Sequence, residues 1–170
     1  MSVLNIKLYP SEVLRKKAVE VKELDGRLLK LIDNMIETMY DASGAGLAAP
    51  QVGVSRRVIV ANPSEREDYP EPIILINPVI AFSEGEIESR EGCLSIPDII
   101  VPVMRAARVF VKGLDRNGKP VGIEAGGLLA RVFQHELDHL NGICLVERMG
   151  PVDREFFTQH YGKGKKTADA

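Results

Sequence analysis

The sequence has few of the features that mark an exported or membrane-inserted protein. It contains only two cysteines and no tryptophan. It also has no apolar run long enough to cross a bilayer. Two cysteines do not make a disulfide framework. The first residues, MSVLNIKLYP, lack a charged leader followed by an apolar stretch, so we expect no signal peptide. These absences predict a reducing, cytoplasmic environment in which a thiol is buried, catalytic or bound to a metal.

The chain also lacks a strong charge of either sign. Its 170 residues carry a formal net charge of −2, so no global positive field draws it to nucleic acid. A basic cluster occurs only near the end, in KGKKTADA, and consists of Lys163, Lys165 and Lys166. We predict one domain over residues 1–161 and a flexible tail over residues 162–170. The tail is either simply solvated or a docking contact for an anionic partner.

The hydrophobic pattern predicts a mixed fold. Apolar residues recur at helical spacing from Leu24 to Tyr40. Strand signals then follow one another in RRVIVAN, PIILINP, VIAFSE, EGEIES, ARVFVKGLD and KPVGIEA, and Asn117-Gly118 predicts a hairpin between the last two. GGLLARVFQHELDHLNG returns to helical spacing, ICLV has the composition of a further strand, and PVDREFFTQHY favours a short C-terminal helix. Consecutive strands favour an α+β fold, with antiparallel or mixed sheets around the late helix and an N-terminal helical segment.

The late helix carries the strongest chemical signal, QHELDHL at residues 134–140. His135 and His139 are four residues apart, so both imidazoles project from one helix face and can bind one metal ion. Glu136 can reach a water on that ion without binding the ion itself, an arrangement that suits metal-assisted hydrolysis. The alternative is a pair of surface histidines. Apolar residues on most sides of the helix favour a buried helix instead.

A catalytic metal site needs a third protein ligand. One extended protease motif would place a third histidine where this chain has Leu145. Cys93, in REGCLSIP, is the better candidate, because the glycine and proline around it favour an exposed, extended turn, and a metal would hold it as thiolate. The alternative for Cys93 is a buried structural thiol. We favour that interpretation for Cys144, which lies in the apolar run ICLV.

Three segments together resemble a known family. GAGLAAPQVG (44–53), EGCLS (91–95) and QHELDHLNG (134–142) resemble, in this order, the three signature motifs of the peptide deformylase family. YPSEVLRKKA (9–18) resembles its N-terminal segment, so the likeness covers nearly the whole chain. The resemblance implies a bacterial-type hydrolase that removes formyl from the N-terminal methionine of nascent polypeptides and releases formate. It also implies one divalent metal bound by Cys93, His135 and His139, usually Fe2+, with Zn2+, Ni2+ or Co2+ as substitutes.

The resemblance further implies the roles of residues around the metal. Glu136 would act first as general base and then as general acid. The side-chain amide of Gln51 and the backbone N–H of Leu94 would stabilise the charge that develops on the formyl oxygen. This gives GAGLAAPQ a chemical purpose, whereas its alternative is a glycine-rich connector between a helix and a strand. Its glycines would let the substrate backbone approach closely, and Gly44 and Gly46 are also able to take backbone angles that other residues avoid.

Substrate binding follows from the same resemblance. The peptide backbone would bind along Ala45, Gly46 and Gly92, and the methionine side chain would enter an apolar pocket beside Leu128 and Val132. The neighbouring Arg131 either rims this pocket or pairs with an acid. We expect Asp138 to be held in an ion pair with a residue such as Arg105, or to orient a metal-bound imidazole.

The implied partners are N-formylmethionyl nascent peptides, with the ribosome near its exit site as a candidate contact for the basic tail. No membrane or sequence-specific nucleic-acid partner is implied. Two alternatives remain open. A general metallopeptidase would cleave internal peptide bonds and use a third ligand other than cysteine. A non-catalytic homologue would bind nascent chains or ribosomes and close its metal site with a fourth protein ligand.

Overall fold

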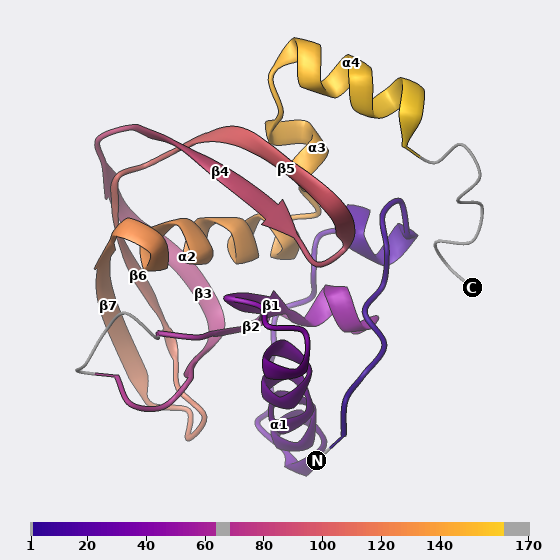
Figure 1. The fold of residues 1–170 in the computed structure, drawn as a ribbon. Helices are drawn as coiled ribbons and strands as arrows, with labels where there is room; N and C mark the ends of the chain where they lie inside the picture. The colour runs from indigo at the N-terminus through magenta and orange to yellow at the C-terminus, as the bar shows by residue number, and fades with distance from the viewer. Residues whose placement is uncertain (1, 64–68, 162–170) are drawn as a thin grey trace.

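Two antiparallel sheets and the helix between them form the framework of the protein (Figure 1). The computed structural model describes residues 2–63 and 69–161. Its elements are the short 3-10 helices η1 (Glu12–Arg15) and η2 (Ala49–Val52), the helices α1 (Gly26–Asp41), α2 (Gly127–Leu140), α3 (Leu145–Arg148) and α4 (Pro151–His160), and the strands β1 (Gly46–Ala48), β2 (Val58–Ala61), β3 (Ile73–Glu84), β4 (Ile87–Cys93), β5 (Ile96–Arg105), β6 (Arg108–Leu114) and β7 (Pro120–Gly126). The predicted α+β class, with the HExxH motif on a central helix, is confirmed.

The larger sheet has the strand order β1-β2-β3-β6-β7. At β2 it is covered by α2 on one face and by α1 on the other. In β2, Ile59 and Ala61 belong to the apolar cluster that packs against α2, whereas Val58 and Val60 belong to the cluster that packs against α1. A strand that is buried on both faces loses the usual alternation of apolar and polar residues, which explains the continuous apolar sequence VIVA. The sheet thus fixes α2 relative to α1.

The smaller sheet consists of β4 and β5, with Gly92 opposite Ile100 and Cys93 opposite Ile96. The sequence pattern did not predict β5 as a strand, because Pro97 and Pro102 interrupt it. Proline cannot donate a backbone hydrogen bond and is therefore tolerated mainly at a sheet edge. Within the described ranges β5 pairs with β4 alone, so its other edge accommodates the prolines.

Two further predictions need correction. The run ICLV is not a strand: it leads into α3, and the carboxylate of Glu147 accepts the backbone N–H of Cys144 at 2.7 Å. A side chain that caps the helix start in this way favours a helix over an extended chain. PIILINP and VIAFSE form one strand, β3, rather than two. Its pairing with β6 shifts register twice, between Ile76 and Val79, where Asn77 has a φ of 53°, and between Ile80 and Phe82.

The end of α2 agrees with the prediction from Asn141-Gly142. Asn141 caps the helix and Gly142 follows with a φ of 75°. A Cβ atom on Gly142 would lie 2.9 Å from the backbone of Arg15, so a larger residue would have to move that segment. This tight turn ends α2, and the chain enters α3 three residues later. The predicted tail, residues 162–170, lies outside the described residues, and no helix within the described ranges is long and apolar enough to cross a membrane.

Candidate metal centre

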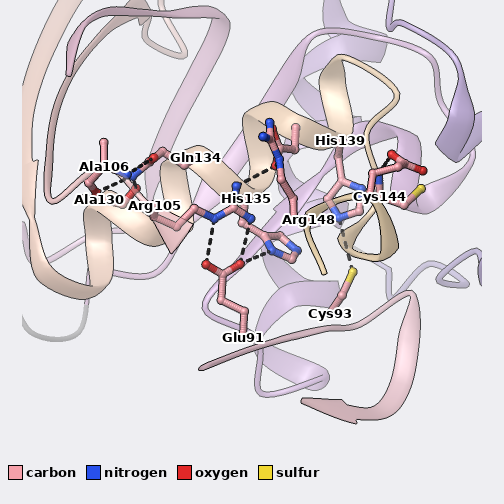
Figure 2. A network of polar contacts seen from close by, with 12 residues as sticks. Glu91, Cys93, Arg105, Ala106, Ala130, Gln134, His135, His139, Cys144 and Arg148 are labelled. Carbon is pink, nitrogen blue, oxygen red and sulfur yellow. Dashed lines mark hydrogen bonds and ion pairs between the residues drawn. The ribbon is translucent and has the colours of Figure 1, made fainter. Parts of the chain in front are cut away.

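Three side chains from two elements converge at the lower face of α2 (Figure 2). Cys93 ends β4, and its Sγ lies 3.4 Å from Nε2 of His139. The rings of His135 and His139 have their centroids 5.0 Å apart. One ligand atom from each of the three residues lies within 4.8 Å of the other two. The sequence-predicted ligands are therefore together in space, although 42 residues separate Cys93 from His135 in the chain.

The chemistry of these three groups fits a single divalent metal. Burial lowers the pKa of His139 well below its usual value, so its imidazole is neutral, which is the form that binds a metal. Thiolate and imidazole together suit zinc, iron or nickel, so the donor set alone does not select the ion. No fourth His, Cys, Asp or Glu joins the cluster in the part of the chain that the structure describes. Three protein ligands leave one position for water or substrate, as catalytic metal sites require.

Glu136 lies beside the cluster and is 4% exposed. Burial raises the pKa of its carboxyl to about 7. Its Oε1 atom has no hydrogen-bond partner among the described residues, and the side chain lines the cavity described below. A buried carboxyl oxygen needs a polar partner, so this atom is suited to contact water or substrate. A carboxyl with a pKa near neutrality can both accept and return a proton.

Gln51 is buried at the end of η2 and its amide is fixed at both ends. Oε1 accepts the backbone N–H of Ala48 at 3.0 Å. Nε2 donates to Oγ of Ser95 at 3.2 Å and lies 3.8 Å from Sγ of Cys93. Because the oxygen is already used by the backbone, the N–H side of the amide faces the cysteine. The site therefore contains a neutral donor that is oriented before any ligand binds.

A cavity of about 700 Å³ opens onto these groups. Every residue predicted to bind substrate or to stabilise the formyl oxygen lines it, namely Ala45, Gly46, Gln51, Gly92, Leu94, Leu128 and Val132. His135, Glu136 and Cys93 also reach the cavity, and Arg131 lies at its wall, which agrees with the first of the two alternatives for this residue. His139 is fully buried and is not part of the lining. One side of the cluster therefore faces the cavity and the other faces the core.

The first two glycines of the first motif do not adopt the backbone angles that favour glycine. Neither Gly44 nor Gly46 has a positive φ, so neither needs the conformational freedom of glycine. Space is the reason instead. A Cβ atom on Gly44 would lie 2.8 Å from Cδ1 of Leu94, and one on Gly46 would lie 2.7 Å from Cγ1 of Val132. The absence of side chains lets β1 approach α2 closely at the cavity wall.

A buried ionic network contacts His135 at Nδ1, the ring nitrogen that would not bind the metal (Figure 2). Arg105 donates two hydrogen bonds to Glu91, each 2.8 Å long, and Oε1 of Glu91 lies 3.1 Å from Nδ1 of His135. Burial alone would raise the pKa of Glu91, but the contacts with Arg105 and His135 lower it to about 2. An ionised Glu91 accepts the Nδ1 proton and leaves Nε2 of His135 free to bind a metal.

The network includes one expected pair and two residues that the sequence did not identify. Nη1 of Arg105 lies 2.7 Å from Oδ2 of Asp138, which confirms the predicted ion pair. Glu91 and Arg148 were missed. The position of Glu91 within EGCLS was the available signal, because β alternation separates it by one residue from Cys93 and places both on one face. Nothing in the local sequence marks Arg148.

Hydrolysis is the reaction that suits these groups. A thiolate and two imidazoles can hold a metal, a buried carboxyl can move a proton, and an oriented amide can stabilise developing negative charge. Cys93, His135, Glu136 and Gln51 line one cavity, and His139 lies buried beside them. The fold and the site together define a metal-dependent hydrolase.

Comparison with known proteins defines the family. A family model described as polypeptide deformylase matches residues 3–155. A peptide deformylase of Thermodesulfovibrio yellowstonii is 58% identical over 166 residues, which cover 98% of this chain and 100% of that relative. The chain belongs to the polypeptide deformylase family, and its activity is that of a peptide deformylase.

Solved structures agree with this assignment. A crystal structure of a peptide deformylase from Legionella pneumophila matches with a TM-score of 0.89 at 45% identity and covers 96% of each chain. A peptide deformylase from Ehrlichia chaffeensis, solved in complex with actinonin, matches with a TM-score of 0.89 at 40% identity and covers 98% of this chain and 100% of that chain. Each match covers at least 96% of this chain, so the similarity extends over nearly the whole fold.

Proposed function

We propose that the cavity binds N-formylmethionyl nascent peptides and that the residues around it remove the formyl group. The observation that carries the proposal is the buried carboxyl of Glu136 beside the Cys93, His135 and His139 cluster at the wall of an apolar cavity. These three residues would hold one divalent metal, Fe2+ in the cell. When bound, the metal would lower the pKa of a water molecule and polarise the formyl carbonyl.

Glu136 moves the proton in this proposal. Its carboxylate accepts a proton from the attacking water as the new C–O bond forms at the formyl carbon. It then returns the proton to the amide nitrogen as the C–N bond breaks, which releases formate and a free amine. The pKa of about 7 supports both steps, since a carboxyl near neutrality is present in each protonation state at physiological pH.

Gln51 and Leu94 would stabilise the negative charge on the formyl oxygen. The amide N–H of Gln51 is turned toward Cys93 by its contact with Ala48, so no reorientation is needed when the charge develops. The backbone N–H of Leu94 follows the cysteine directly and would supply the second donor. Donors that are fixed in advance lower the barrier more than donors that must reorient.

The peptide would lie extended along the cavity. Ala45, Gly46 and Gly92 would hydrogen bond its backbone, because all three line the cavity. Leu128 and Val132 would surround the methionine side chain, because both line the cavity from the first turns of α2. An unbranched thioether fills an irregular apolar pocket well.

We further propose a cytoplasmic, single-domain enzyme over residues 1–161 whose tail, with Lys163, Lys165 and Lys166, contacts the ribosome. The basic composition of the tail supports contact with an anionic surface. Comparing ribosome co-sedimentation of the full chain and of residues 1–161 tests the contact: equal co-sedimentation would remove the tail from this role.

The direct test of the proposed function is formate release. Anaerobically purified protein should release formate from formyl-Met-Ala-Ser, and removal of the metal by a chelator should abolish release until Fe2+ is restored. Oxygen must be excluded because an accessible iron-bound thiolate is prone to oxidation. Acetyl-Met-Ala-Ser serves as the matched control substrate. Cleavage of internal peptide bonds without formate release would favour a general metallopeptidase, and metal binding without any turnover would favour a non-catalytic homologue.

Replacing Gln51 with leucine should lower kcat for formate release by about 10²–10³-fold, with a smaller change in KM, because the donor acts mainly on the charged transition state. Ser95→Ala is the matched control, since it removes the neighbouring hydroxyl while the amide stays attached to Ala48. Steady-state kinetics compare kcat and KM of the two variants with those of the wild type. Equal losses in the two variants would assign the effect to packing around Ser95 instead.

A further inference from the structure

Arg148 lies outside the three motifs but contacts the network behind the metal centre. The turn at Gly142 leads into the short helix α3, whose last residue, Arg148, contacts Asp138, ten residues earlier in the chain. Nε of Arg148 donates to Oδ2 of Asp138 at 2.9 Å and Nη2 donates to Oδ1 at 2.7 Å. This two-point contact fixes both the position and the rotation of the carboxylate.

Asp138 passes this constraint to His135 through Arg105 and Glu91. Arg105, whose side chain is 4% exposed, donates from Nη1 to Asp138 and from Nε and Nη2 to Glu91. Glu91 in turn contacts Nδ1 of His135 (Figure 2). From Arg148 through Asp138 and Arg105 to Glu91 the charges alternate in sign. Each of these four side chains therefore contacts at least one of opposite charge.

Loss of Arg148 would change this balance. The side chain of Asp138 is 11% exposed, so it would depend on Arg105 alone, and Arg105 would then serve two buried carboxylates with one positive charge. Removing one partner from a buried ionic network leaves an uncompensated charge, which the remaining groups must move to accommodate. A shift of Arg105 toward Asp138 would weaken its two hydrogen bonds to Glu91. Glu91 would then hold the ring of His135 less firmly.

We infer that Arg148 is a positioning residue for the metal centre and slows metal loss by fixing Asp138, Arg105 and Glu91 behind His135. The inference rests on the proposed role of His135 as a metal ligand. An exposed ion pair would contribute little, but here the acceptor is buried although the side chain of Arg148 is 42% exposed. Residues that hydrogen bond directly to a metal ligand affect metal affinity about 10–100-fold. Arg148 acts through three intermediates, so we expect about a 3–10-fold effect.

The test measures metal release rather than turnover. Co2+-loaded protein is mixed with excess chelator, and the loss of the visible cobalt absorption gives the dissociation rate. Arg148→Met should accelerate the loss about 3–10-fold and alter the cobalt spectrum before release. Arg148→Lys keeps the charge but not the two-point contact, and should lie between Met and the wild type. Arg154→Met, on the exposed side of α4, is the matched control and should behave as the wild type.

A double-mutant cycle separates positioning from general destabilisation. In an Asp138→Asn background, Arg148→Met should cause little further acceleration, because the contact through which Arg148 acts is already weakened. Cobalt loss at the wild-type rate from folded Arg148→Met, or an equal acceleration with and without Asp138, would overturn the inference. Failure of the proposed function is seen separately, as absence of formate release from wild-type protein that binds metal.

Discussion

Glu136→Gln should lower kcat for formate release by about 10²–10⁴-fold while the protein keeps its metal. Glutamine has nearly the same size as glutamate but cannot accept a proton from water at neutral pH. The expected loss is large because burial raises the pKa of this carboxyl to about 7, whereas the contacts with Arg105 and His135 lower the pKa of Glu91, which also lines the cavity, to about 2. Metal content should not change, since Glu136 is not among the three clustered ligands.

Steady-state kinetics and metal analysis of the same preparation measure both outcomes. Glu155→Gln, on the exposed surface of α4, is the matched control and should retain wild-type kcat. Near-normal formate release by metal-loaded Glu136→Gln would remove Glu136 from its proposed role. Loss of metal together with activity would instead make Glu136 a ligand, which also contradicts the account.

Cys93→Ser should weaken Fe2+ binding by more than about 100-fold. Residues that only support a ligand already affect metal affinity about 10–100-fold, and loss of a ligand should exceed that range. A serine hydroxyl remains protonated near neutral pH and is a much poorer donor than thiolate toward iron. The two histidines alone should then retain little metal, and formate release should fall in parallel with metal content.

The second cysteine provides the control. Cys144 is 2% exposed, and burial raises the pKa of its thiol to about 12, so it remains a neutral apolar side chain. Cys144→Ala should reduce stability through lost packing and leave metal affinity unchanged. Titration of each metal-free variant with Fe2+ under anaerobic conditions compares them. Unchanged affinity in Cys93→Ser would require a different third ligand.

The parts of the site that depend on local spacing were predictable from the sequence. A spacing of four residues brings His135 and His139 to one face of any helix. Asn141-Gly142 favours a helix end regardless of the tertiary surroundings. Cys93 was different, because its distance from the histidines depends on how the small sheet packs against α2. The sequence alone offered arguments for Cys93, but the likeness to a family selected it as the third ligand.

Features that depend on tertiary packing were mispredicted or missed. The segment that forms β5 was not among the predicted strands, and its two prolines are tolerated because the strand lies at a sheet edge, which the sequence does not reveal. The apolar run ICLV fits a strand and a buried helix start equally well, and the cap from Glu147 decides for the helix. Arg148 could not be found from the sequence, since its contact with Asp138 exists only because the chain reverses at Gly142.

The central claim is that one cysteine and two histidines hold a single catalytic metal with a position left open for water. X-ray absorption spectroscopy of anaerobically metal-loaded protein tests it most directly. We expect one metal per chain, with one sulfur and two imidazole nitrogens in its coordination shell and a remaining oxygen that a hydroxamate displaces. A shell without sulfur, or one closed by a fourth protein ligand that the hydroxamate cannot displace, would contradict it.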